Sequence, residues 1–335
     1  MPELPPEPIS PLLRTRRDLL RQGLTDDDIS RRHRAGSFVR LRPGSYADAE
    51  SWGAAYVEAQ TIADAVAYLT ASRGVPPVFS HQTAAAIHGL PLFRCRRGPV
   101  HVTIDGAART TPATVRHRMP LPPGDVVWLP DGAYGVTTMS RTVFDLCAGS
   151  RAETAVAAAD AALRMHATRA GSRTVDPDAA EEFREELRRR ASTATGRRGI
   201  RLARFVTEFT DAHAESTGES VSRLYLHQLG FPPPGLQVPV PGPAGTLYEV
   251  DFDLHTAWGE FDGAAKYTDA RFLRGRTPAQ ALADEKLRED WIRGTTTKPF
   301  ARWGSAHIPD AATFGRHLAA FGIHPPRANA HLLRQ

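Results

Sequence analysis

The chain has 335 residues, of which 41% are hydrophobic and 24% charged, and its net charge at pH 7 is +5. This length exceeds what one hydrophobic core usually organises, so we expect two or three domains, and the excess of arginine makes a polyanionic partner plausible. The sequence contains no apolar run of the roughly 18 to 20 residues that a membrane helix needs, and no secretion signal at its N-terminus, which predicts a cytoplasmic protein with no membrane partner.

Residues 10–52 are expected to form a small unit of their own. Leucines near helical spacing predict a helix over 11–23. A second helix is expected over 25–37, because Thr25 can cap its first turn and three aspartates follow it. The alternation and the Pro-Gly turn that come next predict a hairpin over 38–47. Two helices followed by a hairpin indicate a winged helix-turn-helix.

Arginines gather at two places in this unit. One group ends the second helix and the other lies on the hairpin, the arrangement expected for phosphate contacts on either side of a helix that enters a DNA groove. The alternative is a solvated helix face beside a packing domain. The candidate DNA-binding residues are Arg31, Arg32, Arg34, Arg40 and Arg42.

Residues 53–165 are expected to form an α+β domain. The patterns predict helices over 57–70, after Ser80 and over 140–164, and strands over 100–104, 114–118, 125–129 and 134–139. Ser80, His81 and His88 suggest a hydrolase, but there is no GxSxG elbow, and a helix cap with satisfied histidines is favoured. Cys95 and Cys147 have no CxxC or Cys/His spacing, which argues against a zinc site or a disulfide framework.

The C-terminal part begins with a charged stretch. Residues 166–199 are poor in hydrophobic residues and are expected to be a linker that contains one charged helix. Residues 200–325 then show the element order helix, three strands, helix, strand, helix, which predicts a mixed sheet flanked by helices. The predicted fold class is therefore α/β in the broad sense, with α+β mixed domains.

Acidic residues gather inside two predicted strands of this last domain. Asp251 lies in one strand and Glu260 in the next, so their carboxylates can approach one cation. Hard divalent cations prefer such oxygen ligands, and a lysine nearby can orient the attacking water. Lys266 supplies that lysine, while Asp262 and Glu219 can complete the cluster. The sequence thus predicts a Mg²⁺ or Mn²⁺ site.

These residues also carry a family resemblance over roughly 200–325. The pattern E-S-x-x-R, Q-x-x-V, V-D-F, E-F-D-G-x-x-K-Y and E-K-x-R-E-D resembles the very-short-patch-repair-like PD-(D/E)xK nuclease domain of many actinobacterial proteins. The resemblance implies a restriction-endonuclease-like fold, with metal-binding acids at Asp251 and Glu260, neighbours at Glu219 and Asp262, and Lys266 as the basic catalytic member.

The sequence departs from the family pattern at one position. The usual E-x-K would put lysine at position 262, where this chain has aspartate, and the lysine stands four residues later. Cleavage is therefore an open question. The alternative interpretation is an acidic strand face that pairs with arginines such as Arg223 and Arg288.

The N-terminal part resembles a second family over roughly 10–165. The stretches TDDDISRRHRAGSFVRLRPGSYA and FSHQTAAAIHGLP are similar to AbiEi-like antitoxins of type IV toxin-antitoxin systems. That resemblance implies operator-DNA binding and a nucleotidyltransferase toxin as partner. Two functions follow from the sequence: a DNA-binding protein with a metal-dependent endonuclease domain, or a non-enzymatic antitoxin or transcriptional regulator with a degenerate nuclease fold.

Overall fold

The computed structural model describes residues 10–72, 74–106, 109–130, 132–169, 171–263 and 277–326. The chain divides into two compact units, and the mixed α/β class is confirmed because both combine helices with sheets. Unit 1 comprises residues 1–167 and 176–210, and unit 2 comprises 168–175 and 211–335. Among the described helices, none has both the length and the apolar character needed to cross a bilayer.

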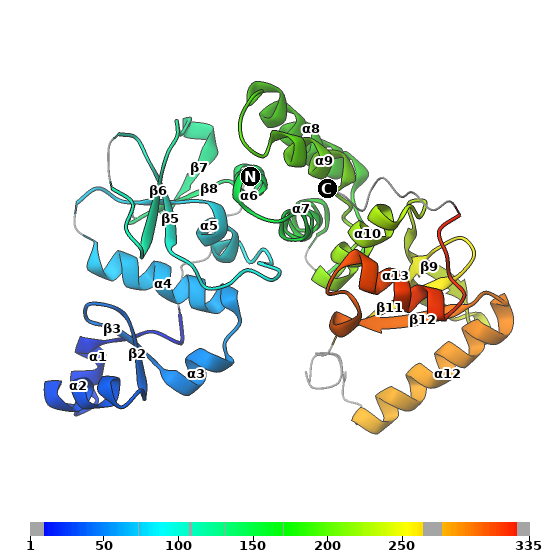
Figure 1. The fold of residues 1–335 in the computed structure, drawn as a ribbon, viewed down its shortest axis with the longest axis horizontal. Helices are drawn as coiled ribbons and strands as arrows, with labels where there is room; N and C mark the ends of the chain where they lie inside the picture. The colour runs from blue at the N-terminus through cyan, green and yellow to red at the C-terminus, as the bar shows by residue number, and fades with distance from the viewer. Residues whose placement is uncertain are drawn as a thin grey trace. The chain divides into compact units, whose positions relative to one another are not determined.

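The N-terminal part of unit 1 combines short helices with a small sheet (Figure 1). The strand order of this sheet is β1-β3-β2. Thr25 and Asp28 form a capping box at the start of α2, so the predicted cap is confirmed. The first helix begins later than predicted, at Arg16, because Thr15 and Asp18 form the same kind of box there. The elements are β1 Arg14–Thr15, α1 Arg16–Arg21, α2 Asp26–Arg34, β2 Phe38–Arg42, β3 Ser45–Asp48 and α3 Ala49–Ala54.

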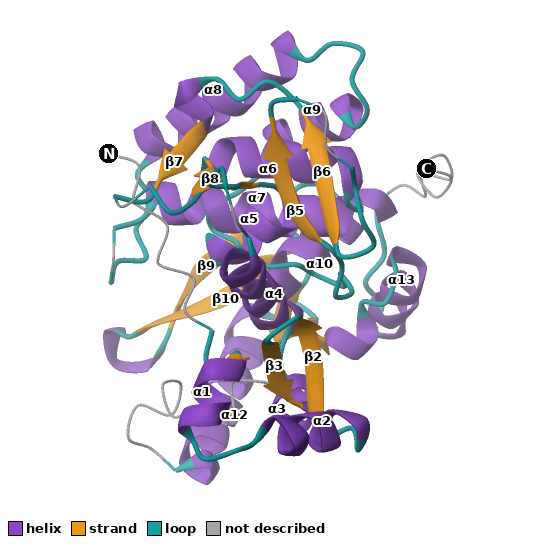
Figure 2. Cartoon of the chain, turned by 90° about the vertical axis from the view of Figure 1, so that its left-hand side faces the viewer, coloured by secondary structure: helices purple, strands orange, loops and turns teal. Residues whose placement is uncertain are grey.

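A mixed sheet of strand order β6-β5-β4-β8-β7 forms the centre of unit 1 in the described chain. Strands β5 and β6 run parallel, side by side, with the bounds that the sequence predicts (Figure 2). Phe79, Val102 and Val136 are fully buried in the core beneath α5. The elements are α4 Val57–Ala71, β4 Val78–Phe79, α5 His81–Ile87, β5 Val100–Ile104, β6 Thr114–Arg118, the 3₁₀ turn Pro123–Asp125, β7 Val126–Trp128 and β8 Gly135–Thr137.

Four helices complete the described part of unit 1. The single helix predicted over 140–164 is in fact two, because the chain takes an extended conformation at Ser150, directly after Gly149. The elements are α6 Met139–Gly149, α7 Ala152–Ala167, α8 Pro177–Thr193 and α9 Ile200–Phe209.

The charged helix expected within residues 166–199 is present as α8, but it packs against neighbouring helices instead of belonging to a linker. Helix α8 contacts α6, α7 and α9, and its stripe of buried side chains is small: Ala180, Phe183, Leu187 and Ala191. Because charged residues surround this narrow stripe, the overall composition of residues 166–199 does not indicate a buried helix face. Helix α9 also belongs to unit 1, so the last unit does not begin near Ile200 as expected but at 211, together with the short segment 168–175.

Unit 2 has the predicted order of helix, three strands, helix, strand and helix. Its sheet has the order β12-β11-β10-β9, in which β11 and β12 are parallel and the other neighbours antiparallel. The elements are α10 Thr217–Leu229, β9 Gly235–Pro241, the 3₁₀ turn Pro243–Gly245, β10 Leu247–Asp253, β11 Trp258–Asp262, α12 Pro278–Thr296, β12 Phe300–Gly304, the 3₁₀ turn Ser305–His307 and α13 Ala311–Ala320.

Helices cover both faces of this sheet. On one face Trp303 of β12 packs against Phe314 of α13 and donates a hydrogen bond from Nε1 to Ser222 Oγ of α10, at 2.8 Å. On the other face Ile292 of α12 lies in a cluster with Trp258 and other strand residues. The result is a three-layer arrangement that holds the acidic strands β10 and β11 between helices.

Candidate functional site

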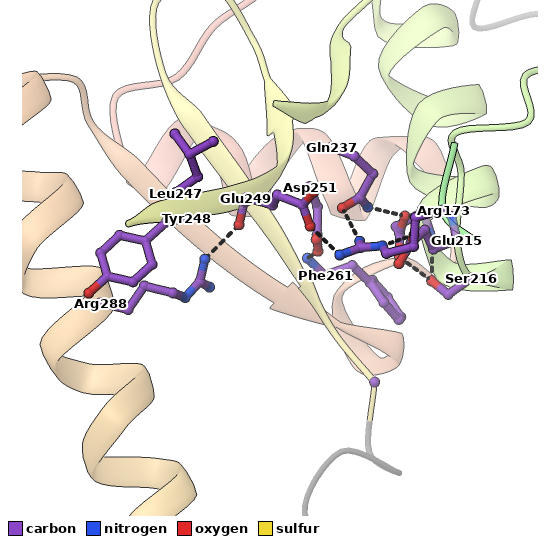
Figure 3. A pocket seen from close by; sticks show the side chains of 12 residues that line it. Arg173, Glu215, Ser216, Gln237, Leu247, Tyr248, Glu249, Asp251, Phe261 and Arg288 are labelled. Atoms are coloured by element: carbon purple, nitrogen blue, oxygen red, sulfur yellow. Dashed lines mark hydrogen bonds and ion pairs between the residues drawn. The ribbon is translucent and has the colours of Figure 1, made fainter. Parts of the chain in front are cut away.

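A cavity of about 550 Å³ opens in unit 2 beside strand β10 (Figure 3). Acidic and basic side chains share its wall with apolar ones, and the charged side chains suit an ionic ligand. The described residues that line it are Arg173, Glu215, Ser216, Glu219, Gln237, Leu247, Tyr248, Glu249, Asp251, Phe261, Gly263 and Arg288.

Glu219 is held at this cavity by the first turn of α10. Ser216 caps the helix by accepting from the Glu219 amide, and its Oγ donates to Glu219 Oε1 at 2.8 Å. The other carboxylate oxygen, Oε2, accepts from the Glu215 amide at 2.8 Å and from Gln237 Nε2 at 3.0 Å. The side chain is only 6% exposed. Its orientation is therefore well determined by the turn that carries it.

Asp251 lies where strands β10 and β11 part. The backbone pairing of the two strands covers Phe252 with Gly259 and Asp253 with Trp258. Beyond it, Asp251 Oδ2 accepts from the Phe261 amide at 2.8 Å. The Asp251 carboxylate thus stands at the end of the paired region, on the cavity wall (Figure 3).

Glu219 and Asp251 are close enough for the charge of one carboxylate to affect the pKa of the other residue. Burial, and to a smaller extent the negative charge of Asp251, raise the pKa of Glu219 to about 7. A cation that joined the two carboxylates would favour the ionised form of Glu219. Their oxygen atoms are the donors that a hard divalent cation prefers, so this pair fits the predicted metal.

Glu260 is placed elsewhere. It is 2% exposed and is absent from the described residues that line the cavity. Its Oε2 accepts from Arg302 of β12, with Nη2 at 2.8 Å and Nε at 3.2 Å, and its Oε1 pairs with Arg288 of α12. This is the arginine pairing that the alternative interpretation expects, and it occupies both oxygens that the metal prediction assigned to a cation.

The other two predicted members have different outcomes. Asp262 lies on β11 with its Oδ2 at 3.7 Å from Arg302 Nε, on the side of the Glu260 ion pairs, and it is not among the described residues that line the cavity. Lys266 lies outside the described residues, so its predicted catalytic role is untested.

Sequence reasoning missed Arg173, which reaches the cavity from a segment expected to be linker. Its Nε donates to Glu215 Oε1 at 2.8 Å, its Nη2 donates to Gln237 Oε1 at 3.2 Å, and its Nη1 pairs with Glu249 (Figure 3). Arg288 contributes a second cation and donates to the Glu249 carbonyl at 2.7 Å. No local motif marks Arg173, because its partners lie 42 to 76 residues further along the chain.

The predicted DNA-binding arginines of unit 1 divide into two groups. Arg31, Arg32, Arg34 and Arg40 are all exposed, and Arg31 also pairs with Asp28 of its own helix. Arg42 differs, because it is half-buried and turned into the unit. Its Nη2 donates to the Ala113 carbonyl and to Thr114 Oγ1, both at 2.9 Å, and its guanidinium lies over the Tyr68 ring. Arg42 therefore has a structural role.

The Ser80 region is polar and buried. Ser80 is the N-cap residue of α5, as predicted, but its side chain makes no hydrogen bond to the helix amides; its Oγ lies 3.0 Å from His81 Nδ1. His88 is a satisfied core histidine, as predicted, with Nε2 at 2.7 Å from the Thr137 carbonyl oxygen.

Comparison with known proteins gives relatives whose names state no activity. No protein-family model matches the chain. It is similar to the uncharacterized protein MT2308 of Mycobacterium tuberculosis (strain CDC 1551 / Oshkosh) and to the uncharacterized protein Rv2248 of Mycobacterium tuberculosis (strain ATCC 25618 / H37Rv). Each is 36% identical over 141 residues, 40% of this chain and 49% of the relative. The chain therefore spans about half the length of the curated relatives it matches.

Proposed function

We propose that unit 2 is a metal-dependent phosphodiesterase of the PD-(D/E)xK kind that acts on DNA. The observation that carries this proposal is the pair of carboxylates of Glu219 and Asp251 on the wall of one ionic cavity. Their oxygen donors suit Mg²⁺ or Mn²⁺, and the cavity is large enough to admit a phosphate group with its sugar.

Each cavity residue has a part in this proposal. A bound divalent cation would polarise a phosphoryl oxygen and lower the pKa of a water molecule. Glu219 and Asp251 would hold the cation, and the hydrogen bonds from Ser216, Gln237 and the Phe261 amide keep their carboxylates in place. Glu260 supports the site from outside the cavity by pairing with Arg288 of α12 and with Arg302 of β12.

Two arginines are suited to binding the anionic substrate. Arg173 and Arg288 both line the cavity, and a guanidinium presents paired donors that match phosphate oxygens. Arg173 is about half exposed and pairs with two glutamates, so a phosphate can replace exposed carboxylate partners at low cost. Lys266 remains our proposed basic group for orienting the attacking water.

Purified full-length protein tests this proposal directly. Supercoiled plasmid and single-stranded DNA are incubated with 5 to 10 mM Mg²⁺ or Mn²⁺, roughly the range that saturates weak carboxylate sites. We expect nicking or linearisation that EDTA abolishes. Absence of cleavage of both substrates in both metals would overturn the proposed activity.

We also propose that residues 10–52 form a winged helix that binds the DNA backbone. The exposed arginines at the end of α2 and on β2 support it, because Lys and Arg contacts to phosphates supply most of the affinity for DNA of arbitrary sequence. Arg42 is left out of this surface because its guanidinium is engaged with Tyr68 and Thr114.

A triple variant with Arg31, Arg32 and Arg40 changed to alanine is expected to bind DNA at least about tenfold more weakly. Each lost phosphate contact should also reduce the salt slope of log K by about 1. The measurement is fluorescence anisotropy with a 30-base-pair duplex, about three turns of DNA, at several salt concentrations. Arg151→Ala serves as the matched control, since Arg151 is an exposed arginine elsewhere in unit 1. Equal losses in both variants would contradict the proposed surface.

A second candidate function is a non-enzymatic, AbiEi-like regulator or antitoxin with a degenerate nuclease fold. It is favoured by the ion pairs that occupy Glu260 and by the aspartate at position 262, where the nuclease pattern has lysine. In that case the chain would bind its operator, and the partner would be a nucleotidyltransferase toxin. Retained DNA binding without cleavage in the two experiments above would select this function.

A further inference from the structure

Three histidines of unit 1 gather at one point, although they are far apart in the sequence. His81 is the first residue of α5, His101 lies in β5 and His117 in β6. Strands β5 and β6 are parallel neighbours, with Thr103 opposite His117, so His101 and His117 project from the same face of the sheet. One ring nitrogen from each histidine lies within 4.8 Å of the others.

The contacts among the three rings are close. His101 Nδ1 lies 2.9 Å from His117 Nε2, so one of these nitrogens donates its proton to the lone pair of the other. The rings of His81 and His117 are stacked, with centroids 3.6 Å apart and planes inclined by 10°. Burial lowers the pKa of His81 to about 2 and that of His101 to about 4, and the neighbouring imidazoles act in the same direction. Burial thus disfavours the protonated form of these rings, and neutral imidazole is the form that binds metals.

The surroundings of His81 resemble the outer shell of a metal ligand. Its Nδ1 lies 3.0 Å from Ser80 Oγ and 3.9 Å from Asp145 Oδ2, which leaves Nε2 as its free ligand atom. Metal-binding histidines usually donate a hydrogen bond from their other ring nitrogen to a carboxylate, a backbone carbonyl or water. Here Ser80 Oγ is within hydrogen-bond distance of Nδ1, and the Asp145 carboxylate lies just beyond it. Asp145 Oδ2 is buried and has no hydrogen-bond partner among the described residues, while Oδ1 accepts from Arg141 Nε at 2.9 Å. A metal on Nε2 would leave the proton on Nδ1, where it faces these two acceptors.

The backbone at His81 supports the same assignment. Its φ angle is +51°, in the left-handed region that costs a non-glycine residue free energy. This conformation places the imidazole beside His117 at the start of α5, instead of along a regular helical turn. The strained backbone of His81 thus positions an imidazole, a common metal ligand, next to two others.

We propose that His81, His101 and His117 bind a transition-metal dication of the Zn²⁺ class. Three imidazole nitrogens suit Zn²⁺, Co²⁺ or Ni²⁺ and not Mg²⁺, so this site differs in chemistry from the carboxylate pair of unit 2. Tetrahedral ligation at about 2.0 to 2.1 Å places nitrogens roughly 3.3 Å apart, so the His101–His117 distance has to open by a few tenths of an ångström. The His81 ring, which is stacked on His117, also has to turn so that the in-plane lone pairs of the three nitrogens meet at one ion. The fourth position remains for water or an anionic ligand.

Metal titration of the full-length, tag-free protein tests the site. After treatment with a chelator, the protein is titrated with Zn²⁺ by calorimetry and with Co²⁺ by visible absorption. We expect one tight equivalent of Zn²⁺ and the intense d–d bands of four-coordinate Co²⁺. His117→Gln, on the half-buried edge strand β6, is expected to weaken Zn²⁺ binding at least about 100-fold, and Asp145→Asn about tenfold, because outer-shell changes typically cost 10- to 100-fold.

Two controls separate this site from other metal binding. His213→Gln changes an exposed histidine of unit 2, and Asp251→Asn changes the carboxylate pair; both should retain the tight Zn²⁺ equivalent and the cobalt spectrum. Circular dichroism verifies that His117→Gln is folded, and His101→Gln provides an independent ligand variant. Absence of tight binding by the wild type, or unchanged binding in both ligand variants, would overturn the proposal and leave the cluster as a stack of neutral core histidines.

Discussion

Replacing Asp251 by asparagine is expected to reduce metal-dependent DNA cleavage at least about 100-fold. Even outer-shell changes around a bound metal cost 10- to 100-fold, and this change removes a proposed ligand charge. Glu219→Gln should have a similar effect, since Glu219 supplies the other carboxylate on the cavity wall. The measurement is the initial rate of plasmid nicking at several Mg²⁺ and Mn²⁺ concentrations, which separates weaker metal binding from slower chemistry.

The same variants should remain folded. Asp251→Asn keeps an oxygen for the Phe261 amide and removes the charge that raises the pKa of Glu219, so the free energy of unfolding should stay constant or rise by about 1 kcal/mol. Glu249→Gln is a matched control, because Glu249 lines the same cavity but is more exposed and pairs with Arg173. If this control lost as much activity as Asp251→Asn, the assignment of Asp251 as a metal ligand would fail.

Replacing Arg302 by methionine is expected to destabilise unit 2 by about 3 kcal/mol, because it removes the central cation of a largely buried ion-pair network. Its guanidinium lies 2.8 Å from Glu260, 3.4 Å from Glu289 and 3.7 Å from Asp262, and it also pairs with Glu285. Urea unfolding followed by tryptophan fluorescence measures the change.

Arg173→Met provides the comparison for this prediction. Arg173 also pairs with two glutamates, but its side chain is 54% exposed, so its loss should change the free energy of unfolding by less than about 1 kcal/mol. If Arg302→Met changed the free energy of unfolding by less than about 1 kcal/mol, the buried charge of Glu260 would not require Arg302 for its stability. Glu260 would then again be a candidate metal ligand.

Much of the fold could be predicted because local patterns and tertiary packing agree. The strands 100–104 and 114–118 have the predicted bounds, since their β-branched residues also fill a buried sheet. Prediction fails where a local interaction, such as a helix cap, outweighs a longer hydrophobic pattern. The leucine spacing extends the first helix back to residue 11, yet the capping box at Thr15 begins it at Arg16. Likewise, the alanine-rich stripe of α8 is too narrow to register as a core face amid charged residues.

The candidate site could be predicted only in part, because its ionic partners come from distant segments. Asp251 and Glu219 follow from element order and helix position. The neutralisation of Glu260 depends on Arg302, 42 residues away on a parallel neighbouring strand. The histidine cluster has the same origin: no spacing rule relates His81 to His101 and His117, and only the sheet register and the turn before α5 bring them together.

The division of the chain between its units limits how the protein can be dissected genetically. A fragment that starts at Ile200, where the sequence alone suggests a boundary, would lack Arg173 and would carry α9 without α6, α7 and α8, exposing the buried side chains of Ala203 and Val206. We expect such a truncation to aggregate and to misrepresent the cavity. The shortest informative C-terminal expression fragment would instead have to supply residues 168–175 as a tethered peptide, joined to residue 211 in place of α8 and α9.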